Sequence, residues 1–352
     1  MVSPTALLTS PLRVALRNPI ATGPLLVSIL YYSDKLEKIL PPAVFAIVKS
    51  AGFVHALRVF LAISIIRKLS NRLSTYVLNH GKSAARIVKS QELALITGGA
   101  SGIGELMARE FASKGVRVVI LDLQPPKTPL PSTIAYYTCN VTKSSELASV
   151  ASKIRATYGH PTILINNAGV TGDVLPILTA DEKAIRNLFE VNTISHFLTV
   201  KEFLPAMVKQ NHGHVVTIGS LSSYVTCAGM VDYACSKNSA VAFHEGLRQE
   251  LRARYKAPNV RTTLITPSWI RTPMIAPLLA EPSFRDPVLE PEVVSNAIVD
   301  QVLSGNSGHI ILPKSMNILS CIRGWPSWIQ ESIRNTTGQM LAMAETADRS
   351  KW

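Results

Sequence analysis

The sequence predicts an α/β fold, with a doubly wound parallel sheet in one large domain that follows a hydrophobic extension. The chain has 352 residues, of which 47% are apolar, enough for one large domain with appendages. From Glu92 onward short apolar runs alternate with helical stretches, the pattern of a parallel sheet covered on both faces. The residues before Glu92 are apolar and basic instead. We therefore divide the chain into an extension at 1–90, a main domain at 91–313 and an amphipathic tail at 314–352.

The extension is predicted to associate with a membrane. Residues 20–66 are mostly apolar, and a basic run at 67–72 follows them. Lys49 and Arg58 interrupt the apolar run, and a cation at mid-bilayer costs about 2.5–3.5 kcal/mol. A re-entrant or interfacial helix, whose second half begins at Pro41 and Pro42, accommodates these charges better than a clean transmembrane helix. The alternative is a helical hairpin buried in the soluble domain, and no cleaved signal peptide is expected.

The charge of the chain does not indicate a nucleic-acid-binding protein. The formal net charge is +13, and residues 1–90 carry +10 of it, with twelve Lys or Arg against Asp34 and Glu37. The remaining residues carry only +3, and no helix-turn-helix, zinc-finger or RNA-binding pattern accompanies them. A basic excess confined to an apolar segment favours an anionic membrane surface as the partner.

No metal site is expected. Cys139, Cys227, Cys235 and Cys321 show no paired spacing, so we interpret all four as packing residues in a reducing compartment. The pattern "NHGHVV" at 211–216 lacks a third ligand of suitable spacing and is interpreted as a polar turn before a strand.

The main domain is predicted to contain seven strands with helices between them. A sheet of this order binds ligands at the carboxyl ends of its strands, near the point where the strand order reverses. The expected strands are Leu93–Thr97, Val116–Leu121, Ala135–Cys139, Ile163–Asn166, His214–Gly219, Thr262–Thr266 and Ile310–Leu312.

A glycine-rich turn follows the first of these strands and predicts a dinucleotide site of the Rossmann type. Gly98, Gly102 and Gly104 allow a tight turn and a close approach of the backbone to a pyrophosphate, whose charge the following helix N-terminus attracts. Asp122 ends the second strand, 18 residues after Gly104, where a carboxylate accepts hydrogen bonds from ribose hydroxyls and repels a 2′-phosphate. The expected cofactor is therefore NAD rather than NADP.

Tyr233 and Lys237 lie four residues apart and share one face of a predicted helix. A tyrosine with a pKa of about 10 is a poor base at neutral pH. The Lys237 ammonium and the charge of an oxidised nicotinamide both favour the phenolate, which can then accept the proton of an alcohol. Ser220, at the end of the fifth strand, can hydrogen-bond the substrate oxygen. Taken singly, each residue has an ordinary structural explanation, but together behind a nucleotide loop they indicate a catalytic group.

Six motifs in order and spacing resemble the short-chain dehydrogenase/reductase family over residues 92 to about 313. They are "TGGASGIG" (97–104), "NNAG" (166–169), "FEVNT" (189–193), "IGS" (218–220), "YACSK" (233–237) and "TPSWIRT" (266–272). The stretch at 191–220, with the apolar leader and a lipophilic tail, is similar to the membrane or lipid-droplet branch that includes 17β-hydroxysteroid dehydrogenase type 11 and retinol dehydrogenase 10.

The resemblance implies roles for individual residues. Asn192 would bind a water that leads to Lys237, Lys237 would bond the nicotinamide ribose, and Thr272 would bond the carboxamide. The implied catalytic residues are Asn192, Ser220, Tyr233 and Lys237. The implied cofactor-binding residues are Thr97, Gly98, Ser101, Gly102, Ile103, Gly104, Asp122, Asn140, Val141, Asn167, Ala168, Gly169, Tyr233, Lys237, Pro267, Ile270 and Thr272.

Two positions depart from the family pattern. Asn140 stands where the family has Asp, so we expect altered affinity for adenine without loss of the site. Ser268 stands where glycine follows the proline, which would stiffen or reshape the loop over the nicotinamide.

The segment after Pro267 would form a substrate lid, whose apolar residues indicate a lipophilic substrate or, alternatively, a lid packed on its own core. These residues are Trp269, Ile270, Met274, Ile275, Leu278, Leu279 and Phe284. The tail carries Trp325, Trp328 and Ile329 beside Arg323 and Arg334, and would be either an interfacial helix or the cover of a dimer partner.

The sequence therefore predicts a membrane-associated NAD-dependent oxidoreductase that interconverts a lipophilic alcohol, such as a retinoid or steroid, and its carbonyl. The expected partners are this substrate, a membrane or lipid-droplet surface and a second copy of the chain, without nucleic acid. The expected location is the endoplasmic reticulum or a lipid droplet, with the catalytic domain facing the cytosol. One alternative is a reductase or dehydrogenase of a small polyketide or terpenoid intermediate. Another is a lipid-surface scaffold that binds dinucleotide without turnover.

Overall fold

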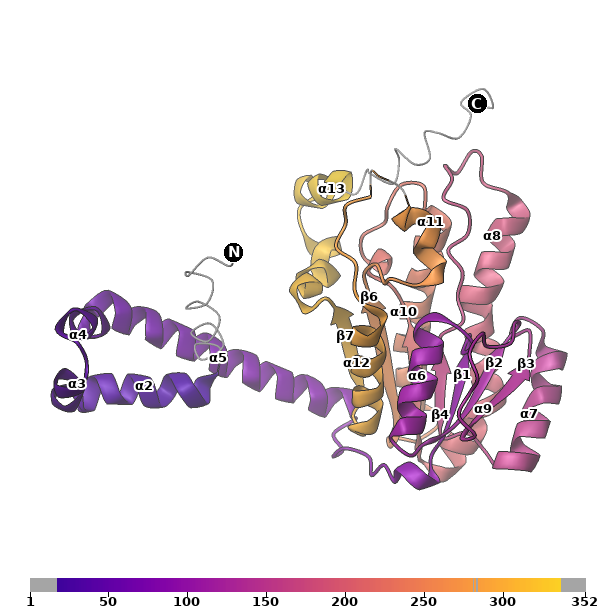
Figure 1. Ribbon diagram of the computed structural model, residues 1–352, viewed down its shortest axis with the longest axis horizontal. Helices are drawn as coiled ribbons and strands as arrows, with labels where there is room; N and C mark the ends of the chain where they lie inside the picture. The colour runs from indigo at the N-terminus through magenta and orange to yellow at the C-terminus, as the bar shows by residue number, and fades with distance from the viewer. Residues whose placement is uncertain (1–17, 281, 283, 337–352) are drawn as a thin grey trace. The chain divides into compact units, whose positions relative to one another are not determined.

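The chain divides into two compact units (Figure 1). The computed structural model describes residues 18–280, 282 and 284–336. Within these residues, the first unit ends at Val77 and the second begins at Leu78. The functional boundaries expected at residues 90 and 313 stay predictions.

The N-terminal unit is entirely helical in its described part, 18–77. Its helices are α2 (Pro19–Tyr31), α3 (Ser33–Ile39), α4 (Pro42–Lys49) and α5 (Ala51–Leu78). Pro42 occupies the first turn of α4, where its missing N–H costs nothing, so the second half of the apolar stretch begins where the sequence predicts. Leu26 and Ile29 of α2 and Leu57 of α5 form a small core.

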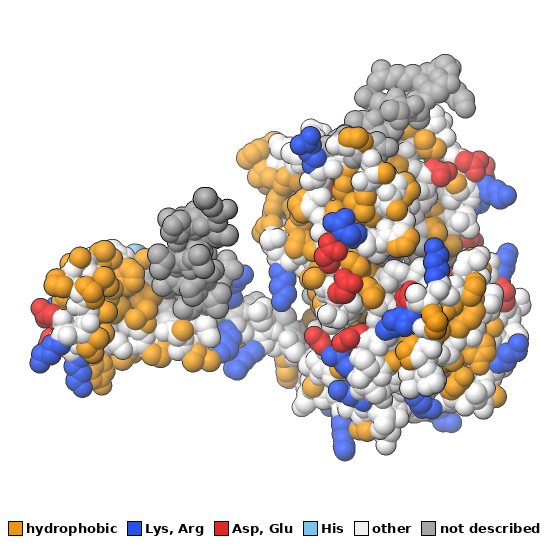
Figure 2. Space-filling model, viewed as in Figure 1, with side chains coloured by type: hydrophobic (Ala, Val, Ile, Leu, Met, Phe, Trp, Pro, Cys, Tyr) orange, Lys and Arg blue, Asp and Glu red, His pale blue; other side chains and the backbone are white. Residues whose placement is uncertain are grey.

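Most of the other large apolar side chains in this unit are exposed. On α5 they include Phe60, Ile63 and Ile66, with Ile66 64% exposed. Figure 2 shows apolar side chains over the visible face of the unit, with Lys and Arg side chains among them. Among the described residues no single helix is both long and apolar enough to cross a bilayer, whereas α4 and α5 together, bent by 59°, pass that test by length and composition.

The second unit contains a seven-stranded, wholly parallel sheet, as the sequence predicts. The strand order is β3-β2-β1-β4-β5-β6-β7, so the order reverses between β1 and β4. The strands are β1 (Leu93–Thr97), β2 (Arg117–Asp122), β3 (Ile134–Thr138), β4 (Ile163–Asn166), β5 (Gly213–Ile218), β6 (Val260–Pro267) and β7 (Gly308–Leu312). Every predicted strand is present, with ends that differ by at most two residues.

Helices cover both faces of this sheet (Figure 1). One face packs against α6 (Gly102–Ser113) and α12 (Pro291–Leu303). The other packs against α7 (Ser144–Tyr158), α9 (Ser195–Gln210) and α10 (Val231–Ala253). The remaining elements are η1 (Lys89–Gln91), α8 (Glu182–Phe189), η2 (Glu190–Ile194), η3 (Leu221–Ser223), η4 (Pro273–Ile275), α11 (Ala276–Leu279), η5 (Lys314–Gly324) and α13 (Ser327–Thr336).

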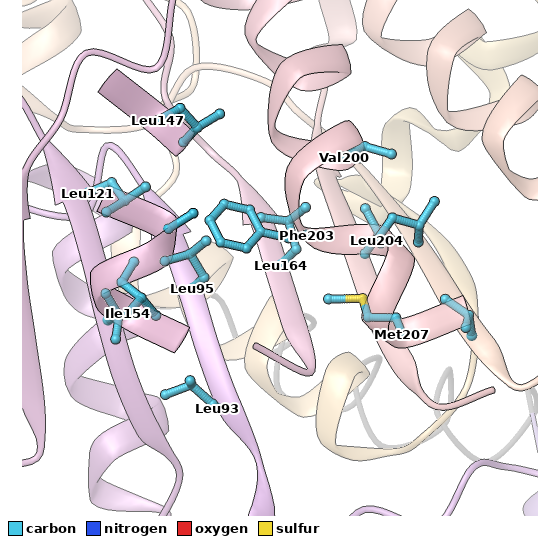
Figure 3. Close-up of a cluster of buried hydrophobic side chains, with 14 of the residues drawn as sticks. Leu93, Leu95, Leu121, Leu147, Ile154, Leu164, Val200, Phe203, Leu204 and Met207 are labelled. Carbon is cyan, nitrogen blue, oxygen red and sulfur yellow. The ribbon is translucent and has the colours of Figure 1, made fainter. Parts of the chain in front are cut away.

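Alternation along the strands supplies two cores, one on each face. Leu93 and Leu95 belong to the core under α7, α9 and α10, whereas Ala94 and Ile96 belong to the core under α6 and α12. Figure 3 shows Phe203 of α9 among Leu95 and Leu164 of the sheet. Burying a side chain of this size stabilises the fold by about 1.5–3 kcal/mol relative to exposing it. The two cores therefore pack both faces of the sheet against its covering helices.

A fully buried arginine ties residues 79–85 to the sheet. Arg261 of β6 donates from Nη1 to the carbonyl oxygens of Asn79 (2.9 Å) and Pro258 (3.0 Å), and from Nη2 to the carbonyl oxygen of Ser83. The Asn79 Oδ1 accepts from the Ser307 N–H at 2.8 Å. Residues 79–85 therefore belong to the second unit, although they precede β1.

A buried ion pair lies beside the start of β1. Glu92 is buried, and both of its carboxylate oxygens lie 3.1 Å from His212 Nε2. Burial acts to raise the pKa of Glu92, but hydrogen bonds from His212 and Thr162 outweigh it and the net shift is downward. The hydrogen bond to Glu92 raises the pKa of His212. "NHGHVV" thus supplies a structural ion pair, and no metal-ligand cluster occurs within the described chain.

We expect His212→Gln to lower Tm by about 2–4 °C near pH 5.5, as a loss of about 1 kcal/mol does in a domain of this size. The depressed pKa of Glu92 contributes stability above its unfolded value of 4.5 and loses it as pH falls. The raised pKa of His212 contributes stability below its unfolded value of 6.5 and loses it as pH rises through the folded value. Thermal unfolding in detergent from pH 4 to 9, with exposed His160→Gln as control, tests this. A Tm difference that is the same at every pH would contradict it.

Candidate active site

The turn between β1 and α6 is shaped by glycines that no other residue could replace. Gly98 and Gly102 have φ of +64° and +56°, in the left-handed region. A Cβ on Gly104 would lie 2.1 Å from the carbonyl oxygen of Gly98, so the helix packs directly on the turn. The free N–H groups of the first turn of α6 are left to face an anion. The turn therefore fits a pyrophosphate.

The loops after β1 and β4 are bonded to each other. Thr97 Oγ1 accepts from the N–H groups of Asn167 and Ala168, each at 3.0 Å. Asn167 Nδ2 donates to the carbonyl oxygens of Thr97 and Gly98, each at 2.9 Å. These bonds hold the glycine turn against the "NNAG" loop at the point where the strand order reverses. Thr97 and Asn167 thus position the turn.

Asp122 ends β2 with its carboxylate fixed. Oδ2 accepts from the Ala100 N–H at 3.0 Å, and Oδ1 accepts from the Gln124 N–H at 3.3 Å. The first bond ties Asp122 to the glycine turn, so the carboxylate and the pyrophosphate cradle keep one relative position. Asp122 also lines the cleft described next.

One cleft of about 620 Å³ runs along the carboxyl edge of the sheet. It brings together every residue predicted to bind cofactor or to act in catalysis except Thr97 and Asn192. Thr97 is buried behind the glycine turn, and Asn192 is fully buried beneath the cleft. The arrangement of the lining residues fits a dinucleotide, because the glycine cradle and Asp122 lie at one part of the cleft wall and Tyr233 and Lys237 at another.

Lys237 is held inside the fold beside Tyr233 on α10. Its Nζ lies 5.8 Å from the centroid of the Tyr233 ring and donates to the carbonyl oxygen of Ile218 at 3.0 Å. The residue is 4% exposed, and burial lowers its pKa to about 8. The lysine is therefore not a solvated helix charge, which removes the simplest structural explanation of the pair.

Tyr233 is buried in the wall of the cleft, and its surroundings in the fold shift its pKa upward. Burial raises its pKa, and a hydrogen bond with the Ser220 side chain acts in the opposite direction. Ser220 lies two residues after the end of β5, is 8% exposed, and accepts from the Ser222 N–H at 3.2 Å. Burial outweighs the hydrogen bond, so lowering the tyrosine pKa requires positive charge close to the phenol.

Asn192 lies in a short π-helical turn, η2, between α8 and α9. Its side chain is fully engaged: Oδ1 accepts from the Val170 N–H at 2.8 Å, and Nδ2 donates to the Val170 carbonyl oxygen and to Ser236 Oγ. A Cβ built on Gly169 would lie 3.3 Å from Asn192 Oδ1 and 3.5 Å from Lys237 Nζ. Gly169 therefore lies close to both side chains, and a larger residue there would press on Asn192 Oδ1. π turns frequently mark functional sites.

The two departures from the family pattern both face the cleft. Asn140 Oδ1 accepts from the N–H and the hydroxyl of Thr142, at 3.0 and 2.8 Å, so its oxygen is used inside the turn. Ser268 Oγ is buried and has no hydrogen-bond partner among the described residues. Its main-chain N–H donates to the Leu312 carbonyl oxygen at 2.8 Å. The loop after β6 is therefore joined to β7.

The lid is divided between the cleft and its own packing. Trp269, Ile270, Met274 and Ile275 line the cleft. Phe284 instead packs edge to face on Trp269, with ring centroids 5.7 Å apart. Part of the segment therefore lines the cleft, while Phe284 packs on the segment itself.

The cysteine interpretation needs correction. Cys139 is buried and Cys227 is half-buried, but Cys235 and Cys321 are exposed and do not act as packing residues. Cys139 and Cys227 line the cleft, which the sequence analysis did not anticipate. The spacing of the cysteines along the sequence did not indicate that Cys139 and Cys227 line the cleft.

A further part of the cleft wall was not expected from the sequence. Its residues follow β4, β5 or β7, and among them only Val191 lies in one of the six motifs, "FEVNT". They are Val170, Thr171, Asn187, Val191, Leu221, Ser222, Val225, Met230, Met316, Leu319, Ile333 and Thr336. The only signal for the last four was the apolar character of the tail.

Comparison with known proteins agrees with this geometry. The model of the short chain dehydrogenase family matches residues 92–282. Dehydrogenase RED2 of Cochliobolus heterostrophus is 43% identical over 199 residues, which cover 56% of this chain and 75% of that protein. Estradiol 17-beta-dehydrogenase 11 of Macaca fascicularis is 36% identical over 279 residues, which cover 76% of this chain and 88% of that protein.

Solved structures share the fold. The 3-ketoacyl-(acyl-carrier-protein) reductase from Brucella melitensis, complexed with NADH, superposes with a TM-score of 0.57 at 20% identity, covering 64% of this chain and 98% of that one. The resemblance inferred from the six motifs is thereby confirmed. This chain belongs to the short-chain dehydrogenase/reductase family, whose members are NAD(P)-linked oxidoreductases of CH–OH groups.

Proposed function

We propose that the protein is a membrane-associated, NAD-dependent dehydrogenase that interconverts a lipophilic alcohol and its carbonyl. The observation that carries the proposal is the meeting of the glycine cradle, Asp122 and the Ser220, Tyr233 and Lys237 side chains in one cleft. A bound nicotinamide dinucleotide supplies the acceptor or donor of the hydride. The residues of the chain supply orientation and the movement of one proton.

In the oxidation direction, Tyr233 takes the proton from the substrate hydroxyl as the carbonyl forms. Ser220 holds the substrate oxygen next to the Tyr233 hydroxyl, with which its own side chain is hydrogen-bonded. The raised pKa of Tyr233 means that the phenolate needs electrostatic support, and Lys237, 5.8 Å from the ring, is the nearby cation. In reduction the same groups act in reverse, and Tyr233 donates the proton.

The proton that Tyr233 takes from the substrate passes to Lys237 and then along the buried residues around Asn192. Lys237 Nζ and the Asn192 side chain both lie close to Gly169. Because the Asn192 side chain is already bonded to Val170 and Ser236, we assign the water that Asn192 would bind to its main-chain carbonyl. Asn192 lies in the π turn Glu190–Ile194, which interrupts the regular α-helical hydrogen-bond pattern between α8 and α9.

A lipophilic substrate is supported by the apolar lining of the cleft beyond the catalytic residues. Leu221, Val225 and Met230 follow β5, and Met274 and Ile275 follow β6. Apolar walls with few polar groups favour an apolar ligand held by one hydroxyl or carbonyl. The similarity to estradiol 17-beta-dehydrogenase 11 supports the same class of substrate.

The test is NADH formation by the full-length protein in membranes, offered retinols, hydroxysteroids and long-chain alcohols. We expect turnover of at least one lipophilic class. NADH binding without turnover across the whole panel, in both directions, would contradict the proposal and favour a dinucleotide-binding scaffold.

The N-terminal unit is proposed to hold the enzyme on a membrane or lipid-droplet surface of the endoplasmic reticulum, with the catalytic domain in the cytosol. Its exposed apolar side chains are unfavourable in water, and Arg67, Lys68 and Arg72 follow them on α5. A homodimer through α9 and α10 stays a prediction.

We expect the double variant Ile63→Asp and Ile66→Asp to lower partitioning onto liposomes by about tenfold or more. Both side chains are exposed on α5, at 46% and 64%, and each contributes about 1.5–3 kcal/mol when it enters an apolar phase. Flotation with vesicles that contain anionic lipid measures the effect. Ser74→Asp, an exposed polar position on the same helix, is the control. Equal flotation of the double variant and this control would contradict the assignment.

A further inference from the structure

The substrate part of the cleft has a wall that comes from the C-terminal part of the chain. We call residues Lys314–Thr336, which comprise η5 and α13, the tail segment. Met316 and Leu319 of η5 and Ile333 and Thr336 of α13 line the cleft. Figure 1 shows α13 at the same end of the catalytic unit as α11, beyond the carboxyl ends of the strands. The tail segment therefore faces the residues that follow β5 and β6.

Arg323 joins the tail segment to residues that lie near the catalytic Ser220 and Lys237 in the sequence. Arg323 Nη2 donates to the Ser223 carbonyl oxygen at 2.9 Å. With the Asn238 amide turned so that its oxygen faces the guanidinium, that oxygen accepts from Arg323 Nη1 at 2.9 Å. Ser223 Oγ donates to the Lys237 carbonyl oxygen at 2.8 Å. One arginine thus joins the tail segment to the turn after Ser220 and to α10 beside Lys237.

Packing and a second hydrogen bond complete the attachment. Ile322, next to Arg323, is fully buried. Gln330 of α13 donates to the Trp325 carbonyl oxygen at 2.7 Å, which joins α13 to the residue that follows η5. Ile333 and Thr336, further along α13, line the cleft. The buried Ile322 side chain and the two hydrogen bonds of the adjacent Arg323 therefore hold the tail segment in place at one point.

We infer that the tail segment determines which lipophilic substrates fit, through Met316, Leu319 and Ile333, and that Arg323 is the positioning residue that keeps this wall in place. The inference rests on the proposed function, because it concerns the substrate of the same site. Arg323 acts through Ser223 and Asn238 and touches neither substrate nor the reacting atoms.

The first test narrows the cleft by enlarging one side chain of its wall. Leu319→Trp should lower kcat/KM for long-chain or polycyclic alcohols by about tenfold or more relative to short secondary alcohols, because a larger side chain fills the pocket. Ile318→Trp is the matched control, since Ile318 is adjacent, 59% exposed and outside the cleft lining. The same substrate profile for both variants and the wild type would overturn the inference while leaving the proposed function intact.

The second test combines a measurement that needs no turnover, hydrogen–deuterium exchange, with steady-state kinetics. Hydrogen–deuterium exchange of the full-length protein should show faster exchange over residues 314–336 and at Ser222 and Ser223 in Arg323→Met, with a partial return in Arg323→Lys. In the same variant KM for the long substrate should rise more than kcat falls, with NADH binding unchanged. Unchanged exchange in Arg323→Met would show that Arg323 does not hold the wall. If the wild type turns over no substrate, the proposed function fails, and the exchange result still decides the role of Arg323.

Discussion

Tyr233→Phe is expected to lower kcat by about 10²–10⁴-fold, the usual contribution of a positioned acid or base. The phenyl ring keeps the packing of α10 and removes only the hydroxyl that exchanges a proton with the substrate. NADH affinity should change by less than about tenfold, because at most one hydrogen bond to the cofactor is lost. Steady-state turnover and NADH fluorescence titration, on the same membrane preparation, measure the two quantities.

Tyr224→Phe is the matched control for this prediction. Tyr224 lies nine residues before Tyr233, does not line the cleft, and its hydroxyl bonds His309 Nε2 at 3.1 Å. Its replacement should leave kcat within about twofold, the range of a substitution remote from the chemistry. Comparable losses in both variants, or turnover retained in Tyr233→Phe, would remove Tyr233 from its proposed role.

Asp122→Asn is expected to reverse or abolish the preference for NAD over NADP. Hydrogen bonds to a charged group contribute about 1.5–3 kcal/mol, so NADH affinity should fall by about 10–100-fold. The same change removes the charge that would repel a 2′-phosphate, so NADPH affinity should hold or rise. The Asp122→Asn substitution is expected to change cofactor binding, while kcat at saturating cofactor stays largely unchanged.

Titration of both reduced cofactors against the wild type and two variants tests this assignment. Asp300→Asn is the control, because Asp300 is 71% exposed and pairs with Lys114 at 3.6 Å, away from the cleft. A wild-type enzyme that binds NADPH more tightly than NADH would contradict the NAD assignment directly. An unchanged cofactor ratio in Asp122→Asn would show that another residue sets the preference.

Several parts of the site could be predicted because their signals are local. The glycines at 98, 102 and 104 require particular backbone geometry, and the structure shows positive φ at two of them and a 2.1 Å clash for any Cβ at the third. Tyr233 and Lys237 share a helix face because of their spacing alone. The seven strands follow from runs of β-branched and apolar residues, and alternation assigned their side chains to two faces.

Other features depend on contacts between residues far apart in sequence. The Glu92 and His212 pair joins positions 120 residues apart, and Arg261 reaches main-chain oxygens 178 and 182 residues earlier. The raised pKa of Tyr233 is a further case, since it follows from how much of the fold surrounds the ring. None of these carries a pattern that spacing or composition could reveal.

The sequence by itself determined the sheet, the glycine-rich turn after its first strand, the shared helix face of Tyr233 and Lys237 and the apolar, basic character of the extension, because backbone geometry, helical spacing and side-chain periodicity are local properties. Only the tertiary structure decided that residues 79–85 belong to the catalytic unit and that the Asn192 side chain is already engaged. It also decided that the tail segment lines the cleft and that Arg323 joins this segment to Ser223. The physical reason is that burial and hydrogen-bond partners across the fold depend on chain segments meeting in space, which periodicity within one segment does not specify.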